Sequence, residues 1–261
     1  MAPEGHLTGK FRGSRPPAPL TGKFRGFRPM RRGCGGWPLA DCAPVTPTAP
    51  DDRQPSLFEG PTPRVQRPVA RMVLLCGPSG SGKTSLTRRL GLPVIALDDF
   101  YRDGDDPALP HRFGIVDWDD PASWDSDAAM RALIDLAARG ATATPVYDIP
   151  TSRRTGTARL DLDGAPLVVA EGIFAAHLVA SCREAGILAD ALCLRLRPVV
   201  TFWRRLARDL SESRKPPRTL VRRGLALMRA EPQLVARWVA LGCRAVSPAE
   251  GEATIRALLR P

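Results

Sequence analysis

Residues 69–90 read VARMVLLCGPSGSGKTSLTRRL, and this stretch carries the strongest indication of the fold. The segment 69–76 is a short apolar run of the kind found in strands that are buried in a parallel sheet. Gly77–Thr84 matches GxxxxGK[ST] at every fixed position, and Ser85–Leu90 has the composition of a starting helix. A strand that runs into a glycine-rich loop and continues as a helix is the context that a phosphate-binding loop (P-loop) requires. The segment therefore predicts a binding site for a nucleoside triphosphate.

The residue types of this loop explain how it would bind phosphate. Glycines let successive backbone N–H groups turn toward phosphate oxygens, and the helix N-terminus adds the positive end of its dipole. Lys83 is expected to reach the β- and γ-phosphates, and the Thr84 hydroxyl is expected to be a ligand of Mg²⁺. The predicted nucleotide site consists of Gly77, Pro78, Ser79, Gly80, Ser81, Gly82, Lys83, Thr84 and Ser85.

Apolar strands and helical segments alternate after the loop. Further buried strands are predicted at 93–97, 167–170 and 191–196, and helices at 127–139, 201–210, 219–229 and 251–260. This alternation predicts an α/β protein with a P-loop NTPase fold, in which helices cover both faces of a doubly wound parallel sheet. Asp98 and Glu171 directly follow two of these strands, so they are expected at the carboxyl edge of the sheet, beside the phosphate loop.

The first 67 residues differ from the rest of the chain in composition. Pro and Gly account for 21 of them, and 11 Lys and Arg stand against 5 Asp and Glu in a chain of net charge +11. Such a segment buries too little apolar surface to offset its ordering entropy, so we expect a disordered extension at 1–67 and a folded domain at 68–261. The repeat LTGKFRG begins at Leu7 and again at Leu20. The extension is open to three interpretations: a segment without function, translated upstream sequence, or a weak nucleic-acid-binding tail.

Other features of the composition limit the class of protein. No apolar run is long enough for a transmembrane helix, and the N-terminus lacks the apolar stretch of a secretory signal. The six cysteines show neither a CxxC pair nor the spacing of zinc ligands, which favours reduced thiols. We therefore expect a cytoplasmic protein without membrane contact.

Five further motifs follow the phosphate loop in order: LDDFYR at 97–102, DWDDPASWD at 117–125, PVYDIPTSRR at 145–154, VAEGIF at 169–174 and RRLARDLSE at 204–212. Together with the loop, they resemble the uridine kinase family of nucleoside kinases, which is related to phosphoribulokinase and bacterial pantothenate kinase. The resemblance covers about residues 70–247. It implies a kinase domain with a small lid that carries arginines.

The resemblance assigns an acceptor site. Asp98 matches the catalytic aspartate that accepts the proton of a sugar 5′-hydroxyl, although the adjacent Asp99 is an alternative. Asp119 matches a carboxylate that holds the ribose hydroxyls, and Tyr147 and Arg154 match groups at the nucleobase pocket.

Tyr101, in the motif LDDFYR, is also predicted to bind the substrate. Two tryptophans of the second motif, Trp118 and Trp124, could either pack in the core or stack on the base.

The resemblance also assigns groups around the transferred phosphate. Glu171 matches an acid near Mg²⁺, while Arg205 and Arg208 match lid arginines that act with Lys83 on the phosphates. Phosphoryl transfer needs mainly positioning and charge neutralisation, which suits these residue types. Arg204 and Arg205 could instead line a solvated face of a helix.

Three departures from the family pattern stand out. Ser152 occupies the position of a histidine near the base, and the proline pair in Ser213–Pro217 is expected to shorten or stiffen the lid. In addition, Gly242–Pro248 lacks the aspartate of the family's end motif, and no apolar strand is predicted there.

The function implied is an ATP- and Mg²⁺-dependent kinase that phosphorylates the 5′-hydroxyl of a nucleoside, with uridine or cytidine favoured. Ser152 leaves open a kinase for another hydroxylated metabolite. A third reading is a nucleotide-binding regulatory protein whose basic tail contacts RNA. The expected partner is a small molecule, with nucleic acid contacted only through the tail, and the sequence leaves the oligomeric state open.

Overall fold

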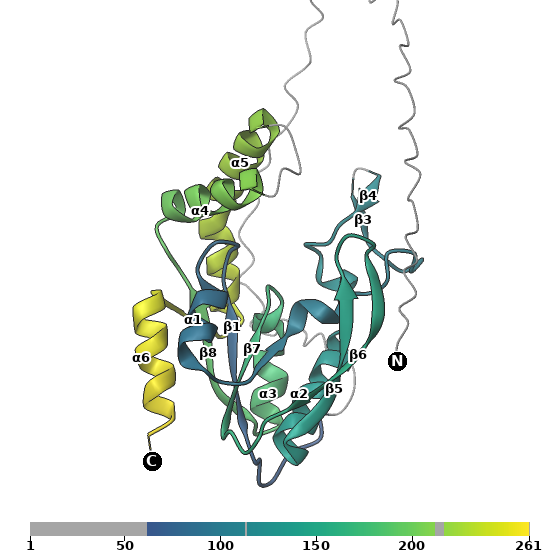
Figure 1. Ribbon diagram of the computed structural model, residues 1–261, viewed down its shortest axis with the longest axis vertical. Helices are drawn as coiled ribbons and strands as arrows, with labels where there is room; N and C mark the ends of the chain where they lie inside the picture. Colours follow the sequence, from purple (N-terminus) through teal and green to yellow (C-terminus); the bar gives the residue numbers. More distant parts are fainter. Residues whose placement is uncertain (1–61, 113, 212–216, 261) are drawn as a thin grey trace, which may run out of the picture. The chain divides into compact units, whose positions relative to one another are not determined.

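The computed structural model describes residues 62–112, 114–211 and 217–260 (Figure 1). The predicted extension therefore lies almost wholly outside the described residues, as do Ser213–Pro216 of the predicted lid. The first described residues already contact the domain, because the Val65 N–H donates to the Ala185 carbonyl at 2.9 Å.

A five-stranded parallel sheet forms the centre of the domain, with the order β2-β7-β1-β8-β9. The strands are β1 (Arg71–Cys76), β2 (Val94–Ala96), β7 (Leu167–Glu171), β8 (Leu188–Leu194) and β9 (Arg244–Val246). The chain passes from β1 to β2 on one side and later places β8 on the other side of β1. Doubly wound sheets bind ligands at the carboxyl ends of strands where the order reverses in this way. The phosphate loop that follows β1 lies at this point.

Helices cover both faces of the sheet, as the alternating sequence predicts. On one face lie α1 (Lys83–Leu90) and α6 (Pro248–Leu258), and on the other α2 (Ser126–Arg139) and α3 (Val179–Glu184) (Figure 1). None of the helices in the described ranges is long and apolar enough to cross a membrane.

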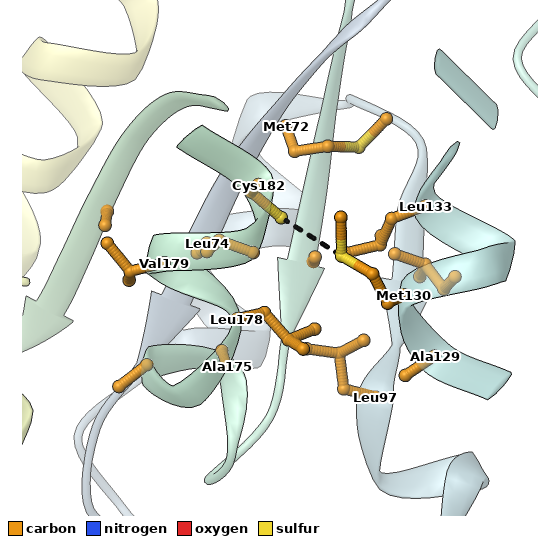
Figure 2. Close-up of a cluster of buried hydrophobic side chains, with 14 of the residues drawn as sticks. Met72, Leu74, Leu97, Ala129, Met130, Leu133, Ala175, Leu178, Val179 and Cys182 are labelled. Atoms are coloured by element: carbon orange, nitrogen blue, oxygen red, sulfur yellow. Dashed lines mark hydrogen bonds between the residues drawn. The ribbon is translucent and has the colours of Figure 1, made fainter. Parts of the chain in front are cut away.

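The side chains of β1 divide between two apolar clusters because successive residues of a strand point to opposite faces. Val73 and Leu75 pack with Leu86 of α1 and Ile255 of α6. Met72 and Leu74 join the larger cluster with α2 and α3, where Figure 2 shows them close to Met130, Leu133, Leu178 and Val179. Cys182 and Met130 lie in the same cluster with their sulfur atoms 3.9 Å apart. This burial on both faces explains why β1 is apolar from Met72 to Cys76, after the exposed Arg71.

Smaller elements surround the carboxyl edge of the sheet. Short 3₁₀ helices are η1 (Leu97–Phe100), η2 (Pro121–Ser123) and η3 (Ala175–Leu178). Two antiparallel pairs are formed by β3 (His111–Arg112) with β4 (Ile115–Val116) and by β5 (Ala141–Asp148) with β6 (Arg153–Asp161). The last two helices are α4 (Pro198–Ser211) and α5 (Pro217–Ala240).

The P-loop fold and the alternation are confirmed, and several details differ from the sequence predictions, which also did not include α3 and the β3–β4 pair. The β5–β6 pair was not predicted, since neither the mostly half-buried β5 nor the exposed β6 has a clear apolar alternation. Helix α5 continues past the predicted end at residue 229 to Ala240, despite Pro232 inside it, because Val235 and Trp238 are buried in the core.

The prediction of no strand in Gly242–Pro248 is wrong. Arg244–Val246 forms β9 and pairs with Leu192–Leu194 of β8. The strand pairs with the edge of β8, and Val246 packs in the apolar cluster under α1 and α6, although the aspartate of the family motif is missing.

Candidate active site

The phosphate loop is held in shape by its own backbone and by Lys83. The ammonium group of Lys83 donates to the Gly77 carbonyl at 2.8 Å. Gly80 has a φ of +87°, and a Cβ at this position would lie 3.1 Å from the Thr201 carbonyl oxygen. Only glycine satisfies both the backbone conformation and this close approach of α4. The sequence motif is thus explained by the local packing as well as by phosphate binding.

Two carboxylates lie beside the loop at the ends of neighbouring strands. Glu171 is the last residue of β7 and pairs in register with Ala96 of β2, while Asp98 follows β2 in η1. The Ile173 N–H donates to Asp98 Oδ1 at 3.3 Å, which fixes one oxygen of this carboxylate. The structure therefore brings together the two acids that the sequence placed at this edge.

The three charged groups Lys83, Asp98 and Glu171 influence one another. Burial lowers the pKa of Lys83, and the negative charges of Asp98 and Glu171 act in the opposite direction. Burial raises the pKa of Asp98, opposed by the Ile173 N–H and by Lys83. Burial also raises the pKa of Glu171, with Lys83 again opposing. A cation near two carboxylates, all three with pKa values shifted by burial, is an arrangement typical of sites that bind phosphate.

The donor groups at this edge fit Mg²⁺ and a nucleotide. Glu171 Oε2 is buried and has no hydrogen-bond partner within the described part of the chain. That part contains no cluster of three or more His, Cys, Asp or Glu side chains suited to a metal. Mg²⁺ is usually held by only one or two carboxylates together with water and substrate phosphates. Glu171 and the exposed Thr84 hydroxyl are the residues that would hold it here.

The arginines of α4 lie next to the phosphate loop. Arg205 is half-buried, and its Nη2 donates to the Ser79 carbonyl at 3.0 Å. Arg204 is exposed, with its Nη1 3.6 Å from the position that a Cβ on Gly82 would occupy. The side chain of Arg208 lies outside the described residues. The described side chains thus place two adjacent arginines at different parts of the loop.

Aromatic side chains form a group next to Asp98. The ring of Tyr101 lies 5.5 Å from Trp118 and 5.9 Å from both Tyr147 and Phe174, measured between centroids. Burial raises the pKa of Tyr101, and the charges of Asp98 and Asp119 add to this effect. Tyr101 is therefore close enough to the predicted catalytic carboxylate and to the exposed Asp119 for both charges to act on its hydroxyl.

Trp124 belongs to the core and not to a base-stacking surface. It is 2% exposed, and its indole N–H donates to the Leu97 carbonyl at 2.7 Å. Trp118 differs from Trp124 in its exposure. It contacts Tyr101 but is only half-buried, so part of it is open to solvent.

The β5–β6 hairpin is tied to the segment that follows Asp98. The Arg154 guanidinium donates to the Tyr101 carbonyl at 3.0 Å and forms an ion pair with Asp125 at 3.4 Å. The Tyr147 hydroxyl donates to the Arg102 carbonyl at 3.2 Å, and the Gly104 N–H donates to the Ser152 carbonyl at 2.7 Å. Both Tyr147 and Arg154 thus hold the backbone of Tyr101 and Arg102 in place next to the aromatic group.

The sequence alone did not single out Ile173 and Gly172, which shape the surroundings of Asp98. Both belong to the motif VAEGIF, but their role depends on how η1 packs against the end of β7. A Cβ on Gly172 would lie 2.8 Å from the Leu97 Cβ and 2.9 Å from Asp98 Oδ1. The absence of a side chain here leaves the room that the carboxylate occupies.

Replacing Gly172 with alanine is expected to displace Asp98. We predict a loss of turnover of about 100-fold, because a misplacement of about 1 Å in a reacting group has that effect. Overpacking should also lower the free energy of unfolding by about 1–3 kcal/mol. Steady-state kinetics and chemical denaturation measure both effects. Gly156→Ala is the matched control, since a Cβ at Gly156 meets no atom within 4 Å; equal turnover in the two variants would contradict the prediction.

Comparison with known proteins places the chain among kinases. A uridine kinase from Deinococcus deserti is 32% identical over 165 residues, which cover 59% of this chain and 76% of that protein. A uridine kinase from Leuconostoc citreum is 27% identical over 164 residues, with 59% and 76% covered. A solved structure from Silicibacter sp. TM1040, described as a fructose transport system kinase, is 19% identical with a TM-score of 0.47, covering 70% of this chain and 90% of that one. No family model matches the chain.

Proposed function

Since this chain belongs to the uridine kinase family of P-loop kinases, we propose that it transfers the γ-phosphoryl group of ATP to the 5′-hydroxyl of a nucleoside, with uridine or cytidine as the favoured acceptor. The observation that carries this proposal is the position of Asp98. Its carboxylate is oriented by the Ile173 N–H and lies within the electrostatic influence of Lys83 and Glu171, beside the phosphate loop.

Each residue of the site has a part in the proposed reaction. Asp98 orients the acceptor hydroxyl and takes its proton as the oxygen attacks the γ-phosphorus. Lys83 neutralises negative charge that spreads over the phosphate oxygens, and Arg205 keeps the loop in place through Ser79. Mg²⁺, bound through Glu171 and Thr84, would supply further charge neutralisation. The residues thus do what phosphoryl transfer mainly requires, which is positioning and electrostatic stabilisation.

The acceptor would bind along the aromatic group. Tyr101, Trp118 and Tyr147 offer flat apolar faces that suit a base or a sugar ring, and the exposed Asp119 can accept hydrogen bonds from vicinal hydroxyls. These groups support a ribonucleoside as the acceptor.

A kinase for another hydroxylated metabolite is the second candidate, and Ser152 favours it. The half-buried Ser152 packs against Gly104, where a Cβ on that glycine would lie 2.9 Å from the Ser152 Cβ. A short hydroxyl in this place offers a different hydrogen-bond pattern from an imidazole, and sites that read polar edges discriminate through such pairs.

An acceptor panel tests both candidates. ADP release from ATP and Mg²⁺ is measured with uridine, cytidine, other nucleosides, deoxynucleosides and simple sugars. Preferential stimulation by uridine or cytidine is the expected result. Stimulation by a non-nucleoside alcohol alone would favour the second candidate, and ADP release that no acceptor stimulates would contradict both.

The pH dependence of turnover is a further prediction. Asp98 must be ionised to accept the proton, and burial raises its pKa above the ordinary 3.8. Activity should therefore be present above the raised pKa and be lost as the pH falls through it. A pH series of kcat from neutral down to about pH 4, run on protein that stays folded, checks this expectation. Turnover that stays constant down to the ordinary pKa would contradict it.

A further inference from the structure

Helix α4 is docked on the phosphate loop by buried contacts. The Thr201 side chain is fully buried, and its hydroxyl lies 2.8 Å from Glu231 Oε2 of α5. Glu231 is itself only 4% exposed. The Thr201 carbonyl lies against Gly80, as described above, and the Arg205 backbone nitrogen lies 3.6 Å from the position of a Cβ on that glycine. The position of α4 over the loop is thus set by packing against α5.

This docking gives the two adjacent arginines different surroundings. The Arg205 guanidinium donates to the Ser79 carbonyl, so it contacts the backbone of the loop itself. The Arg204 guanidinium instead reaches toward Gly82 and stays exposed. In the described ranges, no carboxylate forms an ion pair with Arg204.

The part of the loop that Arg204 approaches carries positive charge, and the nearest acids, Asp98 and Glu171, act on Lys83. Gly82 is the N-cap of α1, the first turn of α1 contains no acidic residue, and its first residue is Lys83. A cation at the positive end of a helix is unfavourable on its own, and an anion bound there reverses the sign of the interaction. The arrangement is therefore the one expected beside a bound polyanion.

We propose that Arg204 binds the phosphate chain of the nucleotide, whereas Arg205 positions the loop. This inference rests on the proposed function, because it takes the loop ligand to be a nucleoside triphosphate. It gives Arg204 a role that the family resemblance assigned to Arg205 and Arg208, and it gives Arg205 a supporting one.

Calorimetric titration of the full chain with ATP and Mg²⁺, without an acceptor, tests the proposal. Arg204→Gln should weaken ATP binding by about 10- to 100-fold, the usual size of a lost hydrogen bond to a charged group. Arg204→Lys keeps the charge but loses the planar fork, so it should lie between wild type and Arg204→Gln. The melting temperature of both variants should stay close to that of wild type, since Arg204 is exposed and forms no hydrogen bond or ion pair among the described residues that would be lost.

Arg131→Gln is the matched control, since Arg131 is an exposed arginine on α2 that forms no hydrogen bond or ion pair within the described ranges. It should leave ATP binding unchanged. ATP binding by Arg204→Gln within about twofold of wild type would overturn the proposal. Failure of the proposed function would be a separate result. In that case the wild-type protein binds ATP and Arg204→Gln weakens this binding, but no acceptor stimulates ADP release.

Discussion

Replacing Asp98 with asparagine is expected to lower acceptor-stimulated turnover by about 10³-fold, within the range that general-base catalysis supplies. The asparagine amide has the shape of the carboxylate, and its oxygen can still accept from the Ile173 N–H. What it loses is the ability to take a proton from the acceptor hydroxyl. Steady-state kinetics with saturating ATP and acceptor measure the effect on kcat.

The stability of this variant has a predictable sign. Burial raises the pKa of Asp98 in the folded state, so the folded protein binds this proton more tightly than the unfolded chain does. The ionised carboxylate therefore disfavours folding at neutral pH, and that cost is relieved as the pH falls through the raised pKa. Asp98→Asn should accordingly have a melting temperature equal to or above that of wild type.

Asp99→Asn is the matched control for the catalytic assignment. Asp99 neighbours Asp98 in the chain, and its pKa is also raised by burial and by the charge of Asp98. No described backbone N–H from the end of β7 is bonded to it, in contrast to Asp98. A larger loss of turnover in Asp99→Asn than in Asp98→Asn would reverse the assignment of the base.

The parts of the fold that the sequence predicts are those with local causes. The apolar run of β1 follows from its burial, and the glycine spacing of the loop follows from its backbone geometry. Both features are found where predicted. The helix at 127–139 was recognised because its apolar positions repeat at helical spacing and Gly140 ends it.

The parts that it does not predict depend on contacts between distant segments. The strand at Arg244–Val246 forms because β8 offers a free edge, and the extension of α5 past Pro232 depends on Trp238 reaching the core. The different positions of Arg204 and Arg205 depend on the docking of α4 by Glu231, 27 and 26 residues further along the chain. No pattern within the motif RRLARDLSE separates these two arginines.

Lys83 links nucleotide binding to the ionisation of the acids. Its ammonium group holds the Gly77 carbonyl, and its positive charge lowers the pKa of both Asp98 and Glu171 against the effect of burial. A substitution that removes the charge should therefore act on affinity and on pH dependence together.

Lys83→Met should weaken ATP binding by at least about 100-fold, because charge-assisted contacts to phosphate are among the stronger hydrogen bonds in proteins. The acid limb of its residual turnover should move to higher pH, since the cation that favours ionised Asp98 is gone. Lys83→Arg keeps the charge and should leave the acid limb close to that of wild type. Arg88→Met, at an exposed position in the last turn of the same helix, should change neither property. Titration calorimetry measures ATP binding, and pH profiles of kcat measure the acid limb. If the acid limb of Lys83→Met coincides with that of wild type, Lys83 does not act on the ionisation of Asp98.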